Sequence, residues 1–208
     1  MGRALHKVHL NLYNNNFRRP EPFDWYQVLA GFKEKIDKYI TKEDKILNLG
    51  CGTSRLGEDL SEEGFEDITN IDISQTVITA MEEKYRETYP KMVFRKMNAL
   101  DMRDFQDGMF NIVIDKGTLD SVMCSDDFVS NGRQLISEVY RVLQPGGKYI
   151  CITYGDPEHR KKHFESQTWE KIVTDKIPKP ATSAKEAKEA DPNRGFHYIY
   201  ILIKKKSG

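Results

Sequence analysis

The sequence KILNLGCGTSR, residues 45–55, decides the fold of this chain. Its apolar run at 46–49 is typical of a short buried strand, and Gly50 and Gly52 predict a tight turn directly after that strand. The two hydroxyl residues at 53–54 suit the N-terminus of a following helix. A strand, a glycine turn and a helix N-terminus in this order are typical of nucleotide-binding α/β folds.

An acidic residue ends the next predicted strand, at 68–71. Asp72 follows Gly52 by about 20 residues, where a carboxylate can accept both ribose hydroxyls of an adenosine ligand. Dinucleotide enzymes place a third glycine where this chain has Arg55, and Gly57 comes too late. S-adenosylmethionine carries no phosphate and needs only the first turn and the acid, so Arg55 favours it. A strand, turn and helix without any ligand is the structural alternative.

The rest of the chain alternates between predicted strands and helices. Helices are predicted over 24–40 (with Asp24 as its cap), 75–88 (capped by Ser74) and 135–143, and strands over 92–96, 110–115 and 149–153. This alternation predicts an α/β fold with a doubly wound, mostly parallel sheet. The segments 169–175 and 196–204 have no helical pattern between them, so we expect them to end the sheet as an antiparallel hairpin.

The length of 208 residues suits a single domain over 23–208. Residues 1–22 are polar and rich in asparagine, and we expect them to form an arm over the domain at its ligand site. The connection 177–194 is charged and long for a compact domain, which predicts a mobile loop.

Charge and cysteine content narrow the class of protein. Lys plus Arg equals Asp plus Glu at 32 each, so no net field recruits nucleic acid or an anionic membrane. We interpret the basic clusters at 160–162 and 204–206 as solvated faces. Cys51, Cys124 and Cys151 lie far apart, which suits a reducing compartment. No apolar run approaches the roughly 18 residues of a membrane span, and no signal-peptide core is present, so we expect a cytoplasmic protein.

Two other patterns suggest chemistry that we do not favour. His159 and His163 would share a helix face, but no third ligand of recognisable spacing follows, so no metal site is expected. Cys51 has no histidine near it in sequence, and a small turn residue explains it better than a nucleophile does.

Two further motifs follow the third and fourth predicted strands. Asn98 and Ala99 come where this architecture borders an adenine ring, and a side-chain oxygen there can accept from the exocyclic amine. The string DKGTLD at 115–120 comes at the carboxyl edge of the sheet, where ligands bind in open α/β folds. The structural alternative for this string is that its acid and its lysine form an ion pair that closes the end of the strand. For the six residues taken together, we favour a functional role.

With these residues in place, the chain resembles the seven-β-strand methyltransferases that depend on S-adenosylmethionine. More narrowly, it is similar to the eukaryotic protein-lysine methyltransferases that modify translation elongation factor 1A and to their citrate-synthase-modifying relatives. The matching motifs are FDWY at 23–26, LGCG at 49–52, DKGTLD at 115–120, EVYRVLQPGG at 138–147 and GFHYIYI at 195–201. LGCG is generic to methyltransferases, whereas DKGTLD and the GFH strand are specific to the narrower group. The resemblance implies a seven-stranded, Rossmann-like sheet.

The resemblance also implies a set of cofactor-binding residues. They comprise a turn for the methionine end (Gly50, Gly52), a ribose pair (Asp72, Ile73), an adenine pair (Asn98, Ala99) and three residues that close the pocket (Tyr13, Trp25, Lys116). The family usually has Asp where this chain has Asn98, a change that keeps an acceptor and removes a charge. The implied product of the cofactor is S-adenosylhomocysteine.

The implied reaction is methylation of a lysine amine on a protein substrate, with elongation factor 1A as the acceptor and the enzyme as a monomer. Asp115, at the end of the fourth predicted strand, is the candidate that orients the amine. In the structural alternative, Asp115 only accepts hydrogen bonds from N–H groups of the loop. Trp25 and Tyr26 are candidates to hold a cation by cation–π contact. A small-molecule methyltransferase shares every cofactor residue and is the main alternative. A non-catalytic S-adenosylmethionine-binding module is less favoured because DKGTLD is retained.

Overall fold

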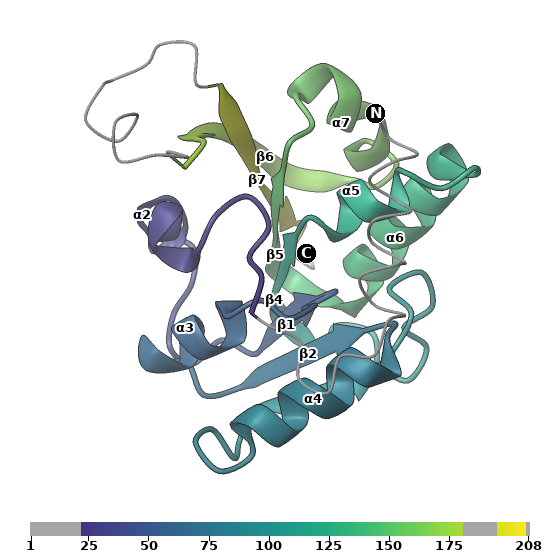
Figure 1. The fold of residues 1–208 in the computed structure, drawn as a ribbon. Coiled ribbons are helices and arrows are strands. Elements are labelled where there is room, and N and C mark those ends of the chain that lie inside the picture. The colour runs from purple at the N-terminus through teal and green to yellow at the C-terminus, as the bar shows by residue number, and fades with distance from the viewer. Residues whose placement is uncertain (1–21, 181–194, 207–208) are drawn as a thin grey trace.

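The computed structural model describes residues 22–180 and 195–206 of the chain (Figure 1). Its strands are β1 (Ile46–Leu49), β2 (Ile68–Asp72), β3 (Val93–Lys96), β4 (Phe110–Lys116), β5 (Leu143–Thr153), β6 (Trp169–Pro178) and β7 (Phe196–Lys204). They form one seven-stranded sheet in the order β3-β2-β1-β4-β5-β7-β6. The five strands β1 to β5 pair in parallel, and β7 pairs antiparallel with both β5 and β6. The predicted α/β sheet with a terminal antiparallel hairpin is confirmed.

Helices cover both faces of this sheet (Figure 1). They are the 3-10 helix η1 (Leu29–Gly31), α2 (Lys33–Ile36), α3 (Leu56–Glu62), α4 (Gln75–Tyr85), α5 (Thr118–Val122), α6 (Phe128–Val142) and α7 (Pro157–Phe164). Apolar residues of η1, α2 and α3 pack on one face, and those of α5, α6 and α7 pack on the other. No helix of the described residues is long and apolar enough to span a bilayer.

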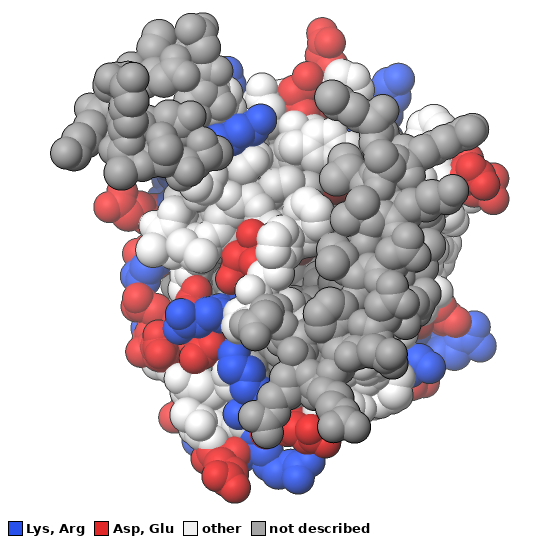
Figure 2. All heavy atoms as spheres, viewed as in Figure 1, with Lys and Arg blue, Asp and Glu red and all other residues white. Residues whose placement is uncertain are grey.

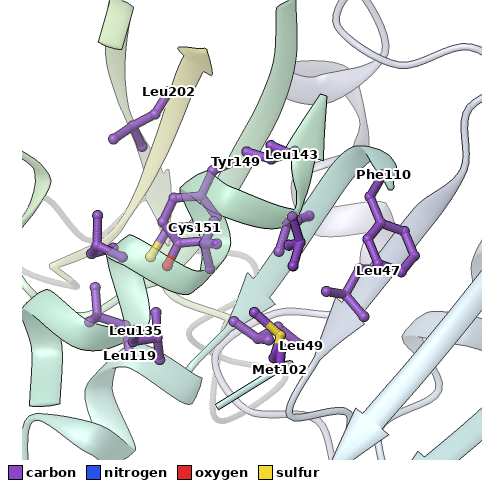
Figure 3. Close-up of a cluster of buried hydrophobic side chains, with 14 of the residues drawn as sticks. Leu47, Leu49, Met102, Phe110, Leu119, Leu135, Leu143, Tyr149, Cys151 and Leu202 are labelled. Atoms are coloured by element: carbon purple, nitrogen blue, oxygen red, sulfur yellow. The ribbon is translucent and has the colours of Figure 1, made fainter. Parts of the chain in front are cut away.

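Side chains that alternate along the strands build two separate cores. One face presents isoleucines to α2 and α3: Ile46, Ile68, Ile112, Ile114, Ile150, Ile152, Ile199 and Ile201. The other presents larger and more varied residues to α5, α6 and α7: Leu47, Leu49, Val113, Tyr149, Cys151, Tyr200 and Leu202 (Figure 3). Strands buried on both faces must be apolar at most positions, and this is why Ile46, Leu47 and Leu49 identify the central strand.

The order of the sheet reverses at β1, which lies between β2 and β4. Leu49 is in register with Ile71 on one side and with Asp115 on the other, so the carboxyl ends of the three strands are level. In open α/β sheets the ligand crevice lies outside the carboxyl ends at such a reversal. The glycine turn after β1, Asp72 at the end of β2 and the loop after β4 therefore meet at one edge.

Several predicted boundaries differ from the observed ones. The helix predicted over 24–40 is wrong, because η1 and the short α2 replace it, although its apolar residues are buried as expected. Helix α4 ends at Tyr85 rather than near 88, and β5 begins at Leu143 rather than at 149. The predicted cap of α4 is confirmed, since the Ser74 side chain accepts from the N–H of Val77. The arm at 1–22 lies almost wholly outside the described residues. So do residues 181–194 of the predicted loop, while its first two residues belong to β6.

Candidate functional site

The turn after β1 is held tightly between its neighbours. Gly50 and Gly52 both adopt the left-handed region, with φ of 64° and 52°. A Cβ on Gly50 would lie 2.2 Å from Oγ1 of Thr118, whose hydroxyl donates to the carbonyl of Leu49 at 2.6 Å. The N–H of Cys51 donates to the carbonyl of Ile71 at 2.8 Å. Glycine is needed at position 50 both for its backbone conformation and for the close approach of α5.

The carboxylate of Asp72 bridges the glycine turn and the next helix. Its Oδ2 accepts from the N–H of Gly52 at 3.0 Å, and its Oδ1 accepts from the N–H of Ser74 at 2.9 Å. Ile73, beside it, is 67% exposed. The turn and the acid therefore lie together, as their spacing in sequence predicts, and their ligand-binding roles stay predictions.

The predicted adenine pair lies next to Asp72. The N–H of Met97 donates to the carbonyl of Asp72 at 2.9 Å, which brings the following residue, Asn98, to the same edge. The Oδ1 of Asn98 accepts from the N–H of Leu100 at 3.0 Å, so this oxygen shapes its own loop. Ala99 packs against the core below.

A buried ion pair ties the segment 22–28 to the end of β4. The Nζ of Lys116 donates to Oδ1 of Asp24 at 2.8 Å and to the carbonyl of Trp25 at 3.1 Å. Asp24 also accepts from the hydroxyl of Ser54 and from the N–H of Arg55. Burial pushes the pKa of Asp24 upward, but the hydrogen bond and the charge of Lys116 outweigh it, so the pKa is lowered. Asp24 therefore joins β4 to the glycine turn, and the prediction that it caps a helix at 24–40 is wrong.

The aromatic residues on either side of Asp24 contact one another. The rings of Phe23 and Trp25 meet edge to face, with 5.0 Å between their centroids. The rings of Trp25 and Tyr26 are 6.2 Å apart. Tyr26 is the one described residue other than glycine with positive φ, at 64°. Tyr13, predicted to close the same pocket, lies outside the described residues.

Asp115 is fully buried beneath the first turn of α5. Its oxygens accept from the N–H groups of Thr118 (2.8 Å) and Leu119 (3.0 Å) and from the hydroxyl of Tyr149 (2.8 Å). Burial raises the pKa of Asp115 to about 7, although these donors oppose the shift. The contacts are those of the structural alternative, an acceptor for loop N–H groups. The catalytic role of Asp115 stays a prediction.

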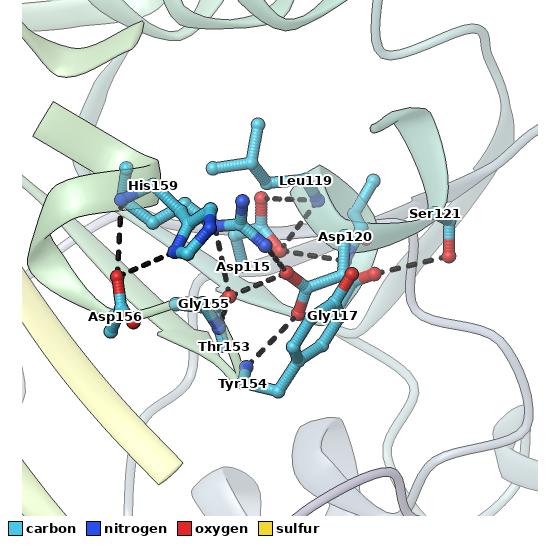
Figure 4. Close-up of polar contacts among 12 residues, drawn as sticks. Asp115, Gly117, Leu119, Asp120, Ser121, Thr153, Tyr154, Gly155, Asp156 and His159 are labelled. Carbon is cyan, nitrogen blue, oxygen red and sulfur yellow. Dashed lines mark hydrogen bonds and ion pairs between the residues drawn. The ribbon is translucent and has the colours of Figure 1, made fainter. Parts of the chain in front are cut away.

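A second buried acid, Asp120, is the centre of a polar network at the ends of β4 and β5 (Figure 4). It accepts from Oγ1 of Thr153 at 2.5 Å, from the N–H of Tyr154 at 3.4 Å and from the guanidinium of Arg160. Arg160 is only 3% exposed, so the interpretation of 160–162 as a solvated face is wrong at its first residue. Gly155 makes room for the guanidinium, because a Cβ there would lie 2.2 Å from Cζ of Arg160.

Sequence reasoning gave no role to Arg160, Gln27 or His197. Arg160, His163 and Phe164 are the buried residues of α7, and their helical spacing was a signal for an inward face. Gln27 and His197 are both 6% exposed, and their side chains lie 3.4 Å apart although 170 residues separate them. No local pattern reports a contact over that separation.

The histidines and Cys51 offer no second reactive centre in the described residues. His159 is exposed and pairs with Asp156 at 2.7 Å, whereas His163 on the same helix is buried. Within 22–180 and 195–206, no three His, Cys, Asp or Glu side chains are grouped as metal ligands. Burial raises the pKa of the Cys51 thiol well above its usual range, which fits a packed turn residue.

Comparisons with known proteins point in one direction. A family model described as a methyltransferase domain matches residues 40–194. The eEF1A lysine and N-terminal methyltransferase of Mus musculus is 38% identical over 188 residues, which cover 88% of this chain and 26% of that protein. The EEF1A lysine methyltransferase 4 of Mus musculus is 33% identical over 192 residues, which cover 88% of this chain and 69% of that protein. The chain therefore spans about a quarter of the first relative and over two thirds of the second.

A solved structure shares the fold at lower identity. The S-adenosylmethionine-dependent methyltransferase of Methanosarcina mazei superposes with a TM-score of 0.64 at 20% identity. The match covers 89% of this chain and 100% of that chain. At this identity the comparison supports the architecture alone.

Proposed function

The chain belongs to the methyltransferase domain family, and on that premise we propose that it transfers a methyl group from S-adenosylmethionine to a lysine side chain of a protein. The bound cofactor would supply an electrophilic methyl group on a sulfonium and leave as S-adenosylhomocysteine. Elongation factor 1A is the proposed acceptor, because both curated relatives are named for it.

One observation carries this proposal: the carboxylate of Asp72 is fixed to the N–H of Gly52 at the reversal of the sheet. This contact holds Asp72, the acid that we propose binds the ribose, beside the glycine turn at the edge where open α/β sheets bind ligands. Gly50 supports the fit, since the position tolerates no Cβ beside Thr118 and leaves bare backbone beside the site. Ile73, Asn98, Ala99, Lys116 and Trp25 are the proposed remaining contacts, and Tyr13 is proposed from the sequence alone.

A lysine acceptor sets the task of the protein residues. A free lysine has a pKa near 10.4, so only about one in a thousand is neutral at pH 7.4. An aromatic slot that excludes water lowers the amine pKa and makes its lone pair available. Trp25 and Tyr26 lie near the end of β4, where such a slot would meet the cofactor site.

The alternative of a small-molecule acceptor has no specific observation in its favour, but it would use the same cofactor residues. The deciding experiment supplies tritiated S-adenosylmethionine to the purified chain with elongation factor 1A, with a whole eukaryotic extract and with the low-mass fraction of that extract. We expect label in a protein, and mass spectrometry should locate it on lysine. Label confined to the low-mass fraction would indicate a small-molecule enzyme.

A chain that binds the cofactor by calorimetry but transfers no label to any fraction would be a binding module. Asp72→Ala, which removes the proposed ribose contact, is the matched negative control for each fraction. Label that persists undiminished in this variant would mean that the transfer does not use the proposed site.

We also propose that residues 23–208 form one catalytic domain that acts in the cytoplasm as a monomer, with residues 1–22 as an arm at the cofactor site. The three free cysteines fit a reducing compartment. Basic and acidic side chains are intermixed over the described part of the face in Figure 2, which favours a protein partner over nucleic acid. Microscopy of a tagged chain and light scattering of the purified one test the location and the monomer.

A further inference from the structure

Tyr26 holds a backbone conformation that tyrosine rarely adopts. Its φ of 64° lies in the left-handed region, where the Cβ of an ordinary residue is crowded by the backbone. Such strain persists only where the surroundings fix it, and it concentrates at functional sites. Contacts on both sides of Tyr26 must therefore hold this conformation.

The segment is pinned on both sides of Tyr26. Before it, Lys116 binds the carboxylate of Asp24 and the carbonyl of Trp25. After it, Nε2 of Gln27 donates to the carbonyl of Pro178 at 2.7 Å and lies 3.4 Å from Nδ1 of His197. The anchors come from β4, β6 and β7, so the strained turn is fixed by the body of the domain.

The anchors place the ring of Tyr26 over the loop after β4. A Cβ on Gly117 would lie 3.2 Å from Cε2 of Tyr26, so the glycine of DKGTLD admits this ring. The ring centroid is 4.8 Å from that of His197 and 6.3 Å from that of Tyr154. Three rings from distant parts of the chain thus form one cluster, which we call the aromatic wall: Tyr26, Tyr154 and His197. Tyr154 is 51% exposed, so the wall reaches the surface.

The wall adjoins the proposed cofactor site through two consecutive residues. Gly117 contacts Tyr26, while the next residue, Thr118, contacts Gly50 of the glycine turn. The ring of Tyr26 and the turn for the methionine end therefore lie on either side of one short loop. A group held at this wall would face the end of the cofactor that carries the methyl group.

The hydroxyl of Tyr26 lies near a carboxylate that is itself paired. Burial raises the pKa of this hydroxyl, and so does the nearby charge of Asp120, which accepts from Thr153 and from the guanidinium of Arg160. Arg160 is buried and forms an ion pair with Asp120, so the two opposite charges lie together beside Tyr26. A tyrosine hydroxyl has one proton to donate, and with that proton directed at Asp120 the lone pairs of its oxygen would accept hydrogen bonds.

We propose that Oη of Tyr26 accepts a hydrogen bond from the amine that is methylated, and that Asp120 with Arg160 fixes this oxygen in place. The proposal rests on the function proposed above and names the acceptor-binding atom. The amine lone pair forms the N–C bond while the C–S bond breaks and leaves its electron pair on sulfur, and the surplus amine proton then passes to water. Positive charge grows on the nitrogen along this step, so a hydrogen bond to Oη strengthens toward the transition state.

Tyr26→Phe tests the proposal, because it keeps the ring and removes only the acceptor oxygen. Asp120 retains its other donors, so the variant should fold and bind S-adenosylmethionine like the wild type. We expect kcat on the protein acceptor to fall about 10- to 100-fold, while the KM for the cofactor changes less than about twofold. The matched control is Tyr85→Phe on α4, whose hydroxyl also donates to a carboxylate, Glu58, at 2.7 Å. It should leave kcat unchanged.

A double-mutant cycle tests the positioning role of Asp120. If Asp120 acts only through Tyr26, Asp120→Asn should lower kcat in the wild type and have little further effect in Tyr26→Phe. Additive losses would overturn that role, and should Asp120→Asn fail to fold, Thr153→Val replaces it by removing one donor to the same carboxylate.

The outcomes separate this inference from the function on which it rests. A wild-type kcat in Tyr26→Phe, with methyl transfer intact, overturns the inference alone. The same holds if the loss of kcat matches a loss of folded protein measured by thermal melting. A wild-type chain that transfers no methyl group overturns the proposed function and the inference with it.

Discussion

The Nζ of Lys116 lies 2.8 Å from Oδ1 of Asp24, across 92 residues of sequence. The two side chains are 4% and 14% exposed, so water screens the pair only weakly. A buried pair of this kind contributes little when both partners are replaced together, but removing one leaves an uncompensated charge. The pair therefore constrains which substitutions the segment 22–28 tolerates.

Asp24→Asn should lower the free energy of unfolding by about 3 kcal/mol, because the ammonium of Lys116 stays buried without its partner. The double variant Asp24→Leu/Lys116→Met should lose less than the single one. Urea denaturation measures both. Glu66→Gln is the matched control, since it breaks a 2.6 Å pair with Lys91 in which both side chains are 71% exposed, and its midpoint should not move. A double variant that loses more than Asp24→Asn would contradict this account.

The same pair predicts a pH dependence of stability. Since Lys116 lowers the pKa of Asp24 below its unfolded value of 3.8, the unfolded chain binds the proton more tightly than the folded one. The stabilisation by Asp24 is therefore complete above that value and is lost as the pH falls through the folded pKa. Denaturation of wild type and Asp24→Asn between pH 7 and about pH 2.5 should give curves that converge at the acid end. A gap that stays constant would exclude the linkage.

Asp72→Ala should weaken the binding of S-adenosylmethionine and of S-adenosylhomocysteine about 10- to 100-fold, or roughly 1.5–3 kcal/mol, by removing charge-assisted ribose contacts. Calorimetry checks this, with Asp175→Ala as control because Asp175 pairs with Lys35 on the exposed surface of β6. Equal affinities of wild type and Asp72→Ala, or tighter binding of NAD than of S-adenosylmethionine, would refute the assignment.

Gly50→Ala and Gly64→Ala separate backbone strain from crowding. Both glycines have positive φ, but a Cβ on Gly64 meets nothing within 4 Å, whereas one on Gly50 lies 2.2 Å from Thr118. Gly64→Ala should cost about 1–2 kcal/mol of stability, and Gly50→Ala about 1–3 kcal/mol more. Thermal melting compares them, and Thr118→Ala in the Gly50→Ala chain should recover part of the difference. Equal losses in the two glycine variants would mean that the close approach of α5 is relaxed in solution.

Asp115→Asn distinguishes the two roles of that residue. The amide would direct a donor at the N–H of Leu119 or the hydroxyl of Tyr149, so we expect a loss of about 1–3 kcal/mol in stability and near-normal turnover per folded molecule. Tyr149→Phe, which removes one donor but keeps the carboxylate, is the control. A large loss of turnover with normal cofactor binding and unchanged melting would instead establish Asp115 as the acid that orients the amine.

The sheet was predictable because its signals are local. The segments 46–49, 68–71 and 110–115 are mostly apolar and buried on both faces, and that pattern is typical of a strand covered on both sides. The helix predicted over 24–40 failed for a long-range reason. Its apolar residues are indeed buried, but the carboxylate of Asp24 binds Lys116 rather than the N–H groups of a helix.

In the candidate site, too, contacts between neighbouring segments were predictable and contacts between distant segments were not. The proximity of Gly52 and Asp72 followed from the spacing of two neighbouring strands. The contacts of Asp120 with Arg160 and of Tyr26 with His197 join segments that nothing in the sequence brings together. The sequence of a basic triplet does not show whether its first residue is solvated or buried against an acid. Arg160 was therefore assigned to the wrong environment.

The position of β7 between β5 and β6 has a consequence for synthesis on the ribosome. Among the described strands β6 pairs with β7 alone, so the nascent chain cannot add β6 to the sheet until β7 has emerged. Until then the edge of β5, with Ile150 and Ile152, has no strand beside it, and open apolar edges promote aggregation. Pairing over long sequence separations also forms slowly. A chain stalled before β7 should therefore depend on chaperones far more than one in which β7 has emerged.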